Sequence, residues 1–128
     1  MIYIDSTIHH DWNRNFNPKL CQALEDLGIS CYLPQRDTNQ QSARQSIFDQ
    51  NHKAMAEADT ILAVAENESP NWGVEIGYAK PFKKRVIILA QKDHHIPTMA
   101  EFLADEVCLV DNIESITDYA NKLAAMLK

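Results

Sequence analysis

The chain has 128 residues, of which 45% are apolar, and its 12 basic and 18 acidic side chains give a formal net charge of −6. This length and composition predict a single domain spanning residues 1–128 with a substantial apolar core. The acidic balance argues against a nucleic-acid polymer as partner, because neutralising bulk phosphate takes many lysines and arginines. No apolar run is long enough to span a membrane, so we expect no membrane partner either.

The cysteines and histidines give no pattern of metal ligation. Cys21, Cys31 and Cys108 are odd in number and widely spaced, which fits neither a zinc site nor a disulfide framework. We expect free, buried thiols and a reducing, cytoplasmic setting. Adjacent histidines, as at 9–10 and 94–95, would point to opposite sides of a strand, so no metal site is expected. No cofactor is expected, because no glycine-rich phosphate loop follows the first strand.

Apolar runs of strand length alternate with helical patterns along the whole chain. The predicted strands are residues 1–4, 29–33, 60–65, 86–90 and 107–110. The first helix is predicted to begin at Asn17 as its cap, with Pro18 in its first turn and Gly28 closing it. Further helices are expected over 42–58, from about 69 to 82, near 99–103 and over 115–127, and residues 35–41 read as a polar loop. In the helix over 42–58, Ile47, Phe48, Met55 and Ala58 are expected on one apolar stripe.

Strands that are continuous apolar runs and alternate with helices predict a parallel sheet covered on both faces. The fold class is therefore α/β, a three-layer sandwich with a doubly wound five-stranded parallel sheet of flavodoxin-like order 2-1-3-4-5. Such sheets bind ligands beyond the carboxyl ends of their strands, near the point where the strand order reverses. The loops after strands one, two and three should meet there.

Glu75 is the acidic side chain that this fold places at the mouth of the site. It follows the third strand and a polar loop, and it lies in the first turns of a helix that Pro70 begins. Gly73 and Gly77 flank it, and two glycines within a helix suggest the close approach of a strand or of a ligand. Such a carboxylate is a candidate nucleophile or general base. The alternative is a charge that only complements the helix dipole.

Three pieces of sequence carry a resemblance to a known family. They are the run 2–4 (Ile-Tyr-Ile), Asn51 upstream of an Ala-Asp pair, and the run 73–79 (Gly-Val-Glu-Ile-Gly-Tyr-Ala). Together they resemble the nucleoside 2-deoxyribosyltransferase family, which includes a branch that hydrolyses the N-glycosidic bond of nucleoside 5′-monophosphates. The likeness covers nearly the whole chain, and Glu-x-Gly-x-Ala after a strand and a polar loop is its most specific piece.

The resemblance implies catalytic roles for three residues. Glu75 matches the nucleophile that attacks C1′ of the sugar and forms a glycosyl-enzyme ester. Tyr3 matches a tyrosine whose hydroxyl holds that carboxylate. Asn51 stands where many members carry an aspartate that orients the sugar and the base, and this departure puts a proton-transfer role there in doubt.

The resemblance also implies a set of substrate contacts. Ser69 matches a phosphate-contacting serine of the monophosphate hydrolases, where transferases often carry an aspartate, and the loop 7–9 is similar to their Ser-Ile-Arg loop, with His9 in place of arginine. The loop 35–37 is expected to meet the base, and the segment 99–105 to complete the neighbouring subunit's site in a homodimer. The expected binding residues are Ser6, Thr7, His9, Gln35, Arg36, Asp37, Ser69, Asn71, Gly73, Met99 and Asp105.

The expected function is cleavage of the N-glycosidic bond of 2′-deoxynucleosides, with transfer of the sugar to another base. Departure of the base leaves an oxocarbenium-like sugar, which a carboxylate stabilises and captures. If water takes the place of the second base, the enzyme is a hydrolase, and a 2′-deoxynucleoside 5′-monophosphate N-glycosidase is the first alternative. A non-catalytic or TIR-like module that processes nucleotides or NAD is the second. The expected ligands are small nucleosides, nucleotides or free bases.

Overall fold

The computed structural model describes residues 1–128 and shows a five-stranded, all-parallel sheet in the order β2-β1-β3-β4-β5. The predicted fold class is therefore confirmed. The strands are β1 (Ile2–Asp5), β2 (Cys31–Tyr32), β3 (Thr60–Val64), β4 (Arg85–Gln91) and β5 (Glu106–Val110). The first and third of these are buried along their whole length, as expected of strands covered on both faces.

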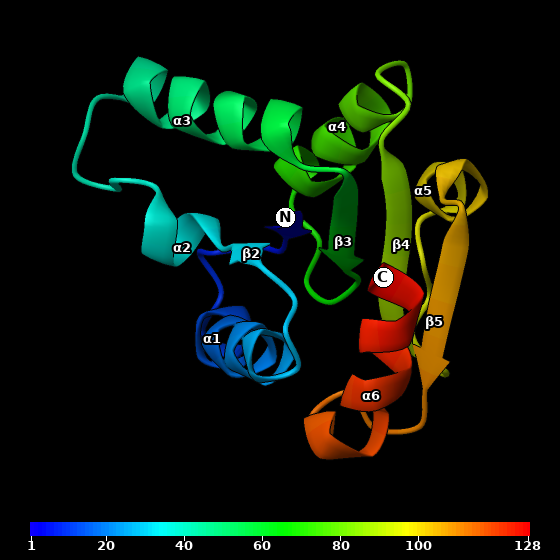
Figure 1. Ribbon diagram of the computed structural model, residues 1–128. Coiled ribbons are helices and arrows are strands. Elements are labelled where there is room, and N and C mark those ends of the chain that lie inside the picture. Colours follow the sequence, from blue (N-terminus) through cyan, green and yellow to red (C-terminus); the bar gives the residue numbers. More distant parts are fainter.

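The chain has six helices, and helices cover both faces of the sheet (Figure 1). They are α1 (Asp11–Asp26), α2 (Pro34–Asp37), α3 (Arg44–Glu57), α4 (Pro70–Ala79), α5 (Thr98–Leu103) and α6 (Ile116–Leu127). Two apolar clusters match the two layers: one joins α1 and α6 to the sheet, and the other joins α3, α4 and α5 to the opposite face. Tyr3 belongs to the second cluster, so its side chain lies on the face of the sheet that α3, α4 and α5 cover.

The first helix differs from its prediction. It begins at Asp11, so Asn17 lies inside it as a buried residue and Pro18 interrupts its hydrogen bonding from within. An asparagine followed by a proline is typical of the start of a helix, but here the two residues lie within α1. The helix tolerates it because the polar groups at the interruption bond to neighbouring loops.

The segment after β2 also departs from its prediction. The strand has only two residues, and Pro34 begins the short helix α2, so 35–41 is not one continuous loop. On α3 the apolar stripe is incomplete, because Phe48 is 59% exposed. The three cysteines are free and buried, as expected. Every helix is too short or too polar to cross a bilayer.

The two glycines beside Glu75 do not mark a close approach within the chain. A Cβ atom added at Gly73 or Gly77 would meet no heavy atom within 4 Å. The approach of a strand, one of the two explanations offered by the sequence, is therefore wrong. Space for a ligand beside this helix stays a prediction.

Candidate active site

Glu75 on α4 and Tyr3 on β1 are joined by a hydrogen bond. The Tyr3 hydroxyl donates a hydrogen bond to Glu75 Oε1 at 3.3 Å. Tyr3 is fully buried and Glu75 is half-buried, so the carboxylate is turned to the sheet and not to bulk water. The local sequence explains this placement, because Ser69 caps α4 by accepting from the Trp72 N–H at 3.3 Å and Pro70 fixes its first turn.

A second carboxyl group, that of Asp5, lies against Glu75. Asp5 ends β1 and is only 4% exposed. Burial, followed by the neighbouring Glu75 charge, raises the pKa of Asp5 well above its ordinary value. Burial also raises the pKa of Glu75, while hydrogen bonds from Asp5 and Tyr3 act to lower it. Tyr3 keeps its proton, because burial and then the neighbouring Glu75 and Asp5 charges raise its pKa.

Ring stacking and two hydrogen bonds connect Tyr3 to Asn51. The rings of Tyr3 and Tyr32 stack with their centroids 5.7 Å apart. The Tyr32 and Thr38 hydroxyls are hydrogen-bonded, and Thr38 donates in turn to Asn51 Oδ1 at 2.5 Å. Asn51 is therefore held at the site by its amide oxygen, and its amide nitrogen is left as a donor. The sequence prediction did not include Tyr32 or Thr38.

The loops after β1 and β3 are tied together at the start of α4. Thr7 donates to the Asn67 carbonyl at 2.8 Å and accepts from the Ser69 N–H at 3.1 Å. Ser6 donates to Asn17 Oδ1 at 2.7 Å. Three of the predicted binding residues, Ser6, Thr7 and Ser69, are thus brought to one place. They are held by hydrogen bonds within the protein.

Two buried asparagines of α1 hold these loops and were missed in the sequence as site residues. Asn13 donates to Ser6 Oγ at 3.2 Å and to the Glu66 carbonyl at 2.9 Å. Asn17 donates to the Thr7 carbonyl at 3.2 Å and to Gln35 Oε1 at 3.0 Å. Both are fully buried. The two asparagines are four residues apart, so they lie on the same face of a helix. This spacing would have identified them if the helix had been predicted to begin before Asn13.

His94 and two glutamates form a cluster beside the start of α4. His94 bonds to Glu68 through Nε2, and its Nδ1 lies 3.7 Å from Glu66 Oε2. A pocket of about 480 Å³ adjoins this cluster between α4 and α5. Its walls are formed by Glu68, Ser69, Pro70, Trp72, Gly73, Ile76, Pro97, Met99, Ala100 and Leu103. Glu75 is not among these residues; its carboxylate bonds instead to Tyr3 of the sheet.

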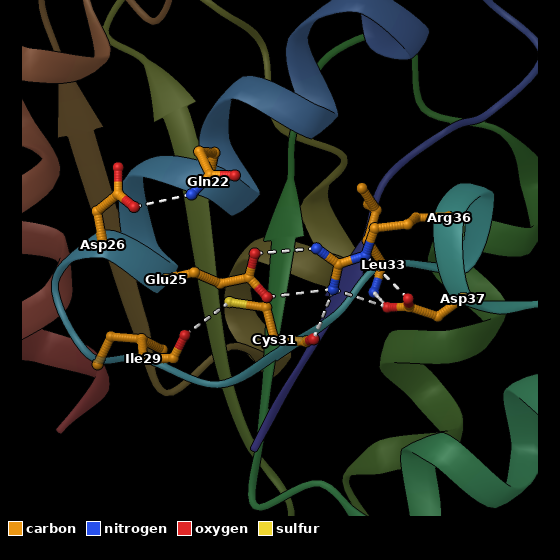
Figure 2. A network of polar contacts seen from close by, with 8 residues as sticks. All are labelled: Gln22, Glu25, Asp26, Ile29, Cys31, Leu33, Arg36 and Asp37. Atoms are coloured by element: carbon orange, nitrogen blue, oxygen red, sulfur yellow. Dashed lines mark hydrogen bonds and ion pairs between the residues drawn. The ribbon is translucent and has the colours of Figure 1, made fainter.

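Other predicted binding residues lie apart from Glu75 or are engaged elsewhere. Arg36 is clamped by Glu25, Asp37 and the Cys31 carbonyl, as Figure 2 shows. Asp37 also accepts from the Leu33 N–H at 2.9 Å. These contacts tie α2 to α1 and β2, so the two charges of the loop 35–37 are used within the fold.

The remaining predicted residues are at the surface or at the other edge of the sheet. His9, Asn71 and Met99 are exposed. Asp105 precedes β5, at the edge opposite the strand ends, and holds Lys80 Nζ at 2.9 Å and the Val86 N–H at 2.8 Å. The bond from Lys80, then that from Val86, lowers the pKa of Asp105. A role for Met99 or Asp105 in a neighbouring subunit stays a prediction.

Fold and site together define a class of α/β protein: a parallel doubly wound sheet in which a tyrosine of the first strand holds a half-buried glutamate. The family model described as nucleoside 2-deoxyribosyltransferase matches residues 2–119. The chain belongs to the nucleoside 2-deoxyribosyltransferase family. No curated protein sequence gives a match.

Solved structures share the fold at low sequence identity. A 2-deoxyribosyltransferase from Bacillus psychrosaccharolyticus aligns with a TM-score of 0.74 and 15% identity, over 96% of this chain and 94% of that one. The CMP N-glycosidase BcmB from Clostridium botulinum aligns with a TM-score of 0.71 and 17% identity, over 98% of both chains. A conserved protein from Enterococcus faecalis V583 aligns with a TM-score of 0.75 and 17% identity, over 95% of this chain and 97% of that one.

Proposed function

We propose that the protein cleaves the N-glycosidic bond of 2′-deoxynucleosides and transfers the sugar to another base, with Glu75 as the nucleophile. The observation that carries the proposal is the Glu75 carboxylate, half-buried and held by the Tyr3 hydroxyl at 3.3 Å. A fixed anion of this kind stabilises an oxocarbenium-like sugar and then captures it at C1′. The base leaves with the electrons of the glycosidic bond, and a second base attacks C1′ to release Glu75.

Asn51 takes the orienting role in this proposal. Its Oδ1 accepts from Thr38, which leaves the Nδ2 amide to donate to a sugar or base oxygen. An amide neither gives nor takes a proton at neutral pH, so the proton for the leaving base comes from another group or from solvent. Family membership supports the reaction class, and the geometry at Glu75 supports the assignment of the nucleophile.

One observation favours the monophosphate hydrolase as the second candidate. Thr7 and Ser69, the two hydroxyl residues at which the chain resembles the monophosphate hydrolases, lie together at the N-terminus of α4, a position that suits an anion. Against it, Glu66 and Glu68 are also in this loop, and His94 already pairs with both. Like charges near a phosphate oppose its binding, so the unphosphorylated nucleoside is the substrate that we favour.

The test is an incubation of the purified chain with deoxyinosine and free adenine, then with deoxynucleoside 5′-monophosphates and with NAD, and chromatography of the released bases. Formation of deoxyadenosine supports the transferase, and free base from monophosphates alone supports the hydrolase. Glu75→Gln should abolish either activity, and Glu57→Gln, an exposed glutamate on α3, is the matched control. Full base release by Glu75→Gln would end the nucleophile assignment.

We propose further that the active unit is a homodimer in which α5 reaches the partner's site. Met99 and Phe102 are 75% and 80% exposed on this short helix, a degree of exposure that suits an interface. Mixing an inactive Glu75→Gln chain with an inactive Met99→Glu chain should restore activity, because a mixed dimer contains one intact site. Activity that stays absent in the mixture would argue that each chain works alone.

A further inference from the structure

Asp5 is an acidic residue in a place built for apolar ones. Side chains along a strand alternate between the two faces, so Asp5 lies on the same face as Tyr3, the face that α3, α4 and α5 cover. Its register partner on β3 is Ala63, a small residue in the same apolar cluster as Tyr3. The small neighbour leaves room for a carboxyl group beneath Glu75.

The surroundings of Asp5 offer no cation. Its Oδ2 atom is buried and has no hydrogen-bond partner, and the charged group that acts on it is the Glu75 carboxylate. The other titratable groups near the pair are Tyr3 on β1 and Tyr32 on β2, whose rings stack. The nearest polar residue described on α3 is Asn51, which is uncharged and accepts a hydrogen bond from Thr38. Two carboxylates in contact without a cation cannot both be ionised, so the pair holds one proton.

We propose that Asp5 is a positioning residue that remains protonated and donates its hydrogen bond to the Glu75 carboxylate. The nucleophile is then ionised and is held by two hydrogen-bond donors, Tyr3 and Asp5. Both donors come from β1, two residues apart. This inference rests on the proposed function for the role of Glu75. It adds a residue that neither the sequence motifs nor the family resemblance assigns.

The proposal fits the charge changes of the reaction. When a Glu75 oxygen bonds to C1′ and the base departs with the glycosidic electron pair, the carboxylate becomes a neutral ester. Asp5 keeps its proton throughout, so none is transferred to the base from this side. When the second acceptor attacks C1′, the C1′–oxygen bond breaks and the carboxylate re-forms against the same two donors. Donors fixed in advance cost no reorganisation at that moment.

Two variants separate a donor from a mere filler. Asp5→Asn keeps a neutral donor, and Asp5→Ala removes it. Loss of a hydrogen bond to a charged group should lower kcat about tenfold or more in Asp5→Ala, with little change in KM. Asp5→Asn should lose less than Asp5→Ala does. Equal losses in two folded variants, or a wild-type rate in Asp5→Ala, would overturn the proposal.

The pH profile gives a readout that a structural role would not change. In the wild type, activity should fall on the alkaline side as Asp5 ionises and repels Glu75, whereas Asp5→Asn should lack this decline. In Asp5→Ala the acid limb should move to higher pH, because Glu75 has lost a donor that lowers its pKa. An alkaline decline that persists unchanged in Asp5→Asn would contradict the assignment.

A titration without substrate distinguishes failure of this inference from failure of the proposed function. The carboxyl carbons of Asp5 and Glu75 can be followed by 13C NMR in the wild-type chain, with Glu75→Gln for comparison. We expect Asp5 protonated at neutral pH, and a lower pKa for Asp5 in Glu75→Gln, where the facing charge is gone. An Asp5 that is ionised at pH 7 in the wild type would refute the inference, whatever the enzyme assays show.

Discussion

The side-chain amide of Gln35 donates to the main-chain carbonyl of Arg14, with Nε2 and O 3.0 Å apart. This carbonyl is the one that an N–H at position 18 would meet in a regular helix, and position 18 is a proline. Gln35 thus replaces a missing bond of α1, and its Oε1 accepts from Asn17. A residue predicted from the resemblance to meet the base is committed, in this structure, to holding α2 against α1.

Replacing Gln35 with leucine should therefore affect stability more than base recognition. The Arg14 carbonyl and the Asn17 amide each lose a hydrogen-bond partner, and this loss should lower the free energy of unfolding by about 1–2 kcal/mol. Denaturant unfolding measures the loss, and Gln22→Leu, which breaks only an exposed bond to Asp26, is the control. A tenfold rise in KM for one base with unchanged stability would restore the original assignment.

Asn17 should be one of the residues least tolerant of substitution outside the catalytic group. It accepts from Ser6 and donates to the Thr7 carbonyl and to Gln35, and it is fully buried. Asn17→Ala leaves these partners unsatisfied and should lower the free energy of unfolding by about 2–4 kcal/mol. The matched control is Asn15→Ala on the exposed side of α1. A loss similar to that of the control would show that water replaces the amide.

The fold was readable from the sequence because strand runs and helix periodicity are local signals that agree with the global pattern. The position of Glu75 followed from that fold and from Pro70 and Ser69, which begin α4. The contacts around it were less accessible. Asn17 followed by Pro18 is typical of a helix start, and only the tertiary bonds to Gln35 and the loops make it an interior position. Asp5 is visible as an acid two residues after Tyr3, but its burial depends on the small residue opposite it on β3.

Asn51→Asp tests whether proton supply limits the reaction. Thr38 already donates to Asn51 Oδ1, so a carboxylate at this position keeps its hydrogen bond and the fold should be undisturbed. If protonation of the leaving base is limiting, the added acid should raise kcat about tenfold at mildly acidic pH, which is less than the roughly 10²–10⁴-fold effect of an optimally placed general acid. Rates of base release from pH 5 to 8 measure this. A profile identical to that of the wild type would mean that position 51 only orients the substrate.

The stability of the protein should reveal the protonated Asp5 without any assay of activity. In the unfolded chain Asp5 titrates near its ordinary pKa of 3.8, while burial and the Glu75 charge raise its pKa in the folded state. Below the unfolded pKa both states hold the proton, and this group costs no stability. As the pH rises above it, the unfolded chain releases a proton that the native chain retains, so native stability falls until the folded pKa is reached, with a limiting slope of about 1.4 kcal/mol per pH unit. Asp5→Asn removes this dependence, and its free energy of unfolding relative to the wild type should grow steadily from pH 4 upward. Urea unfolding across this pH range measures the difference, and the exposed Asp49→Asn is the control. A difference in free energy of unfolding between Asp5→Asn and the wild type that is the same at every pH would show that Asp5 is ionised in the folded protein.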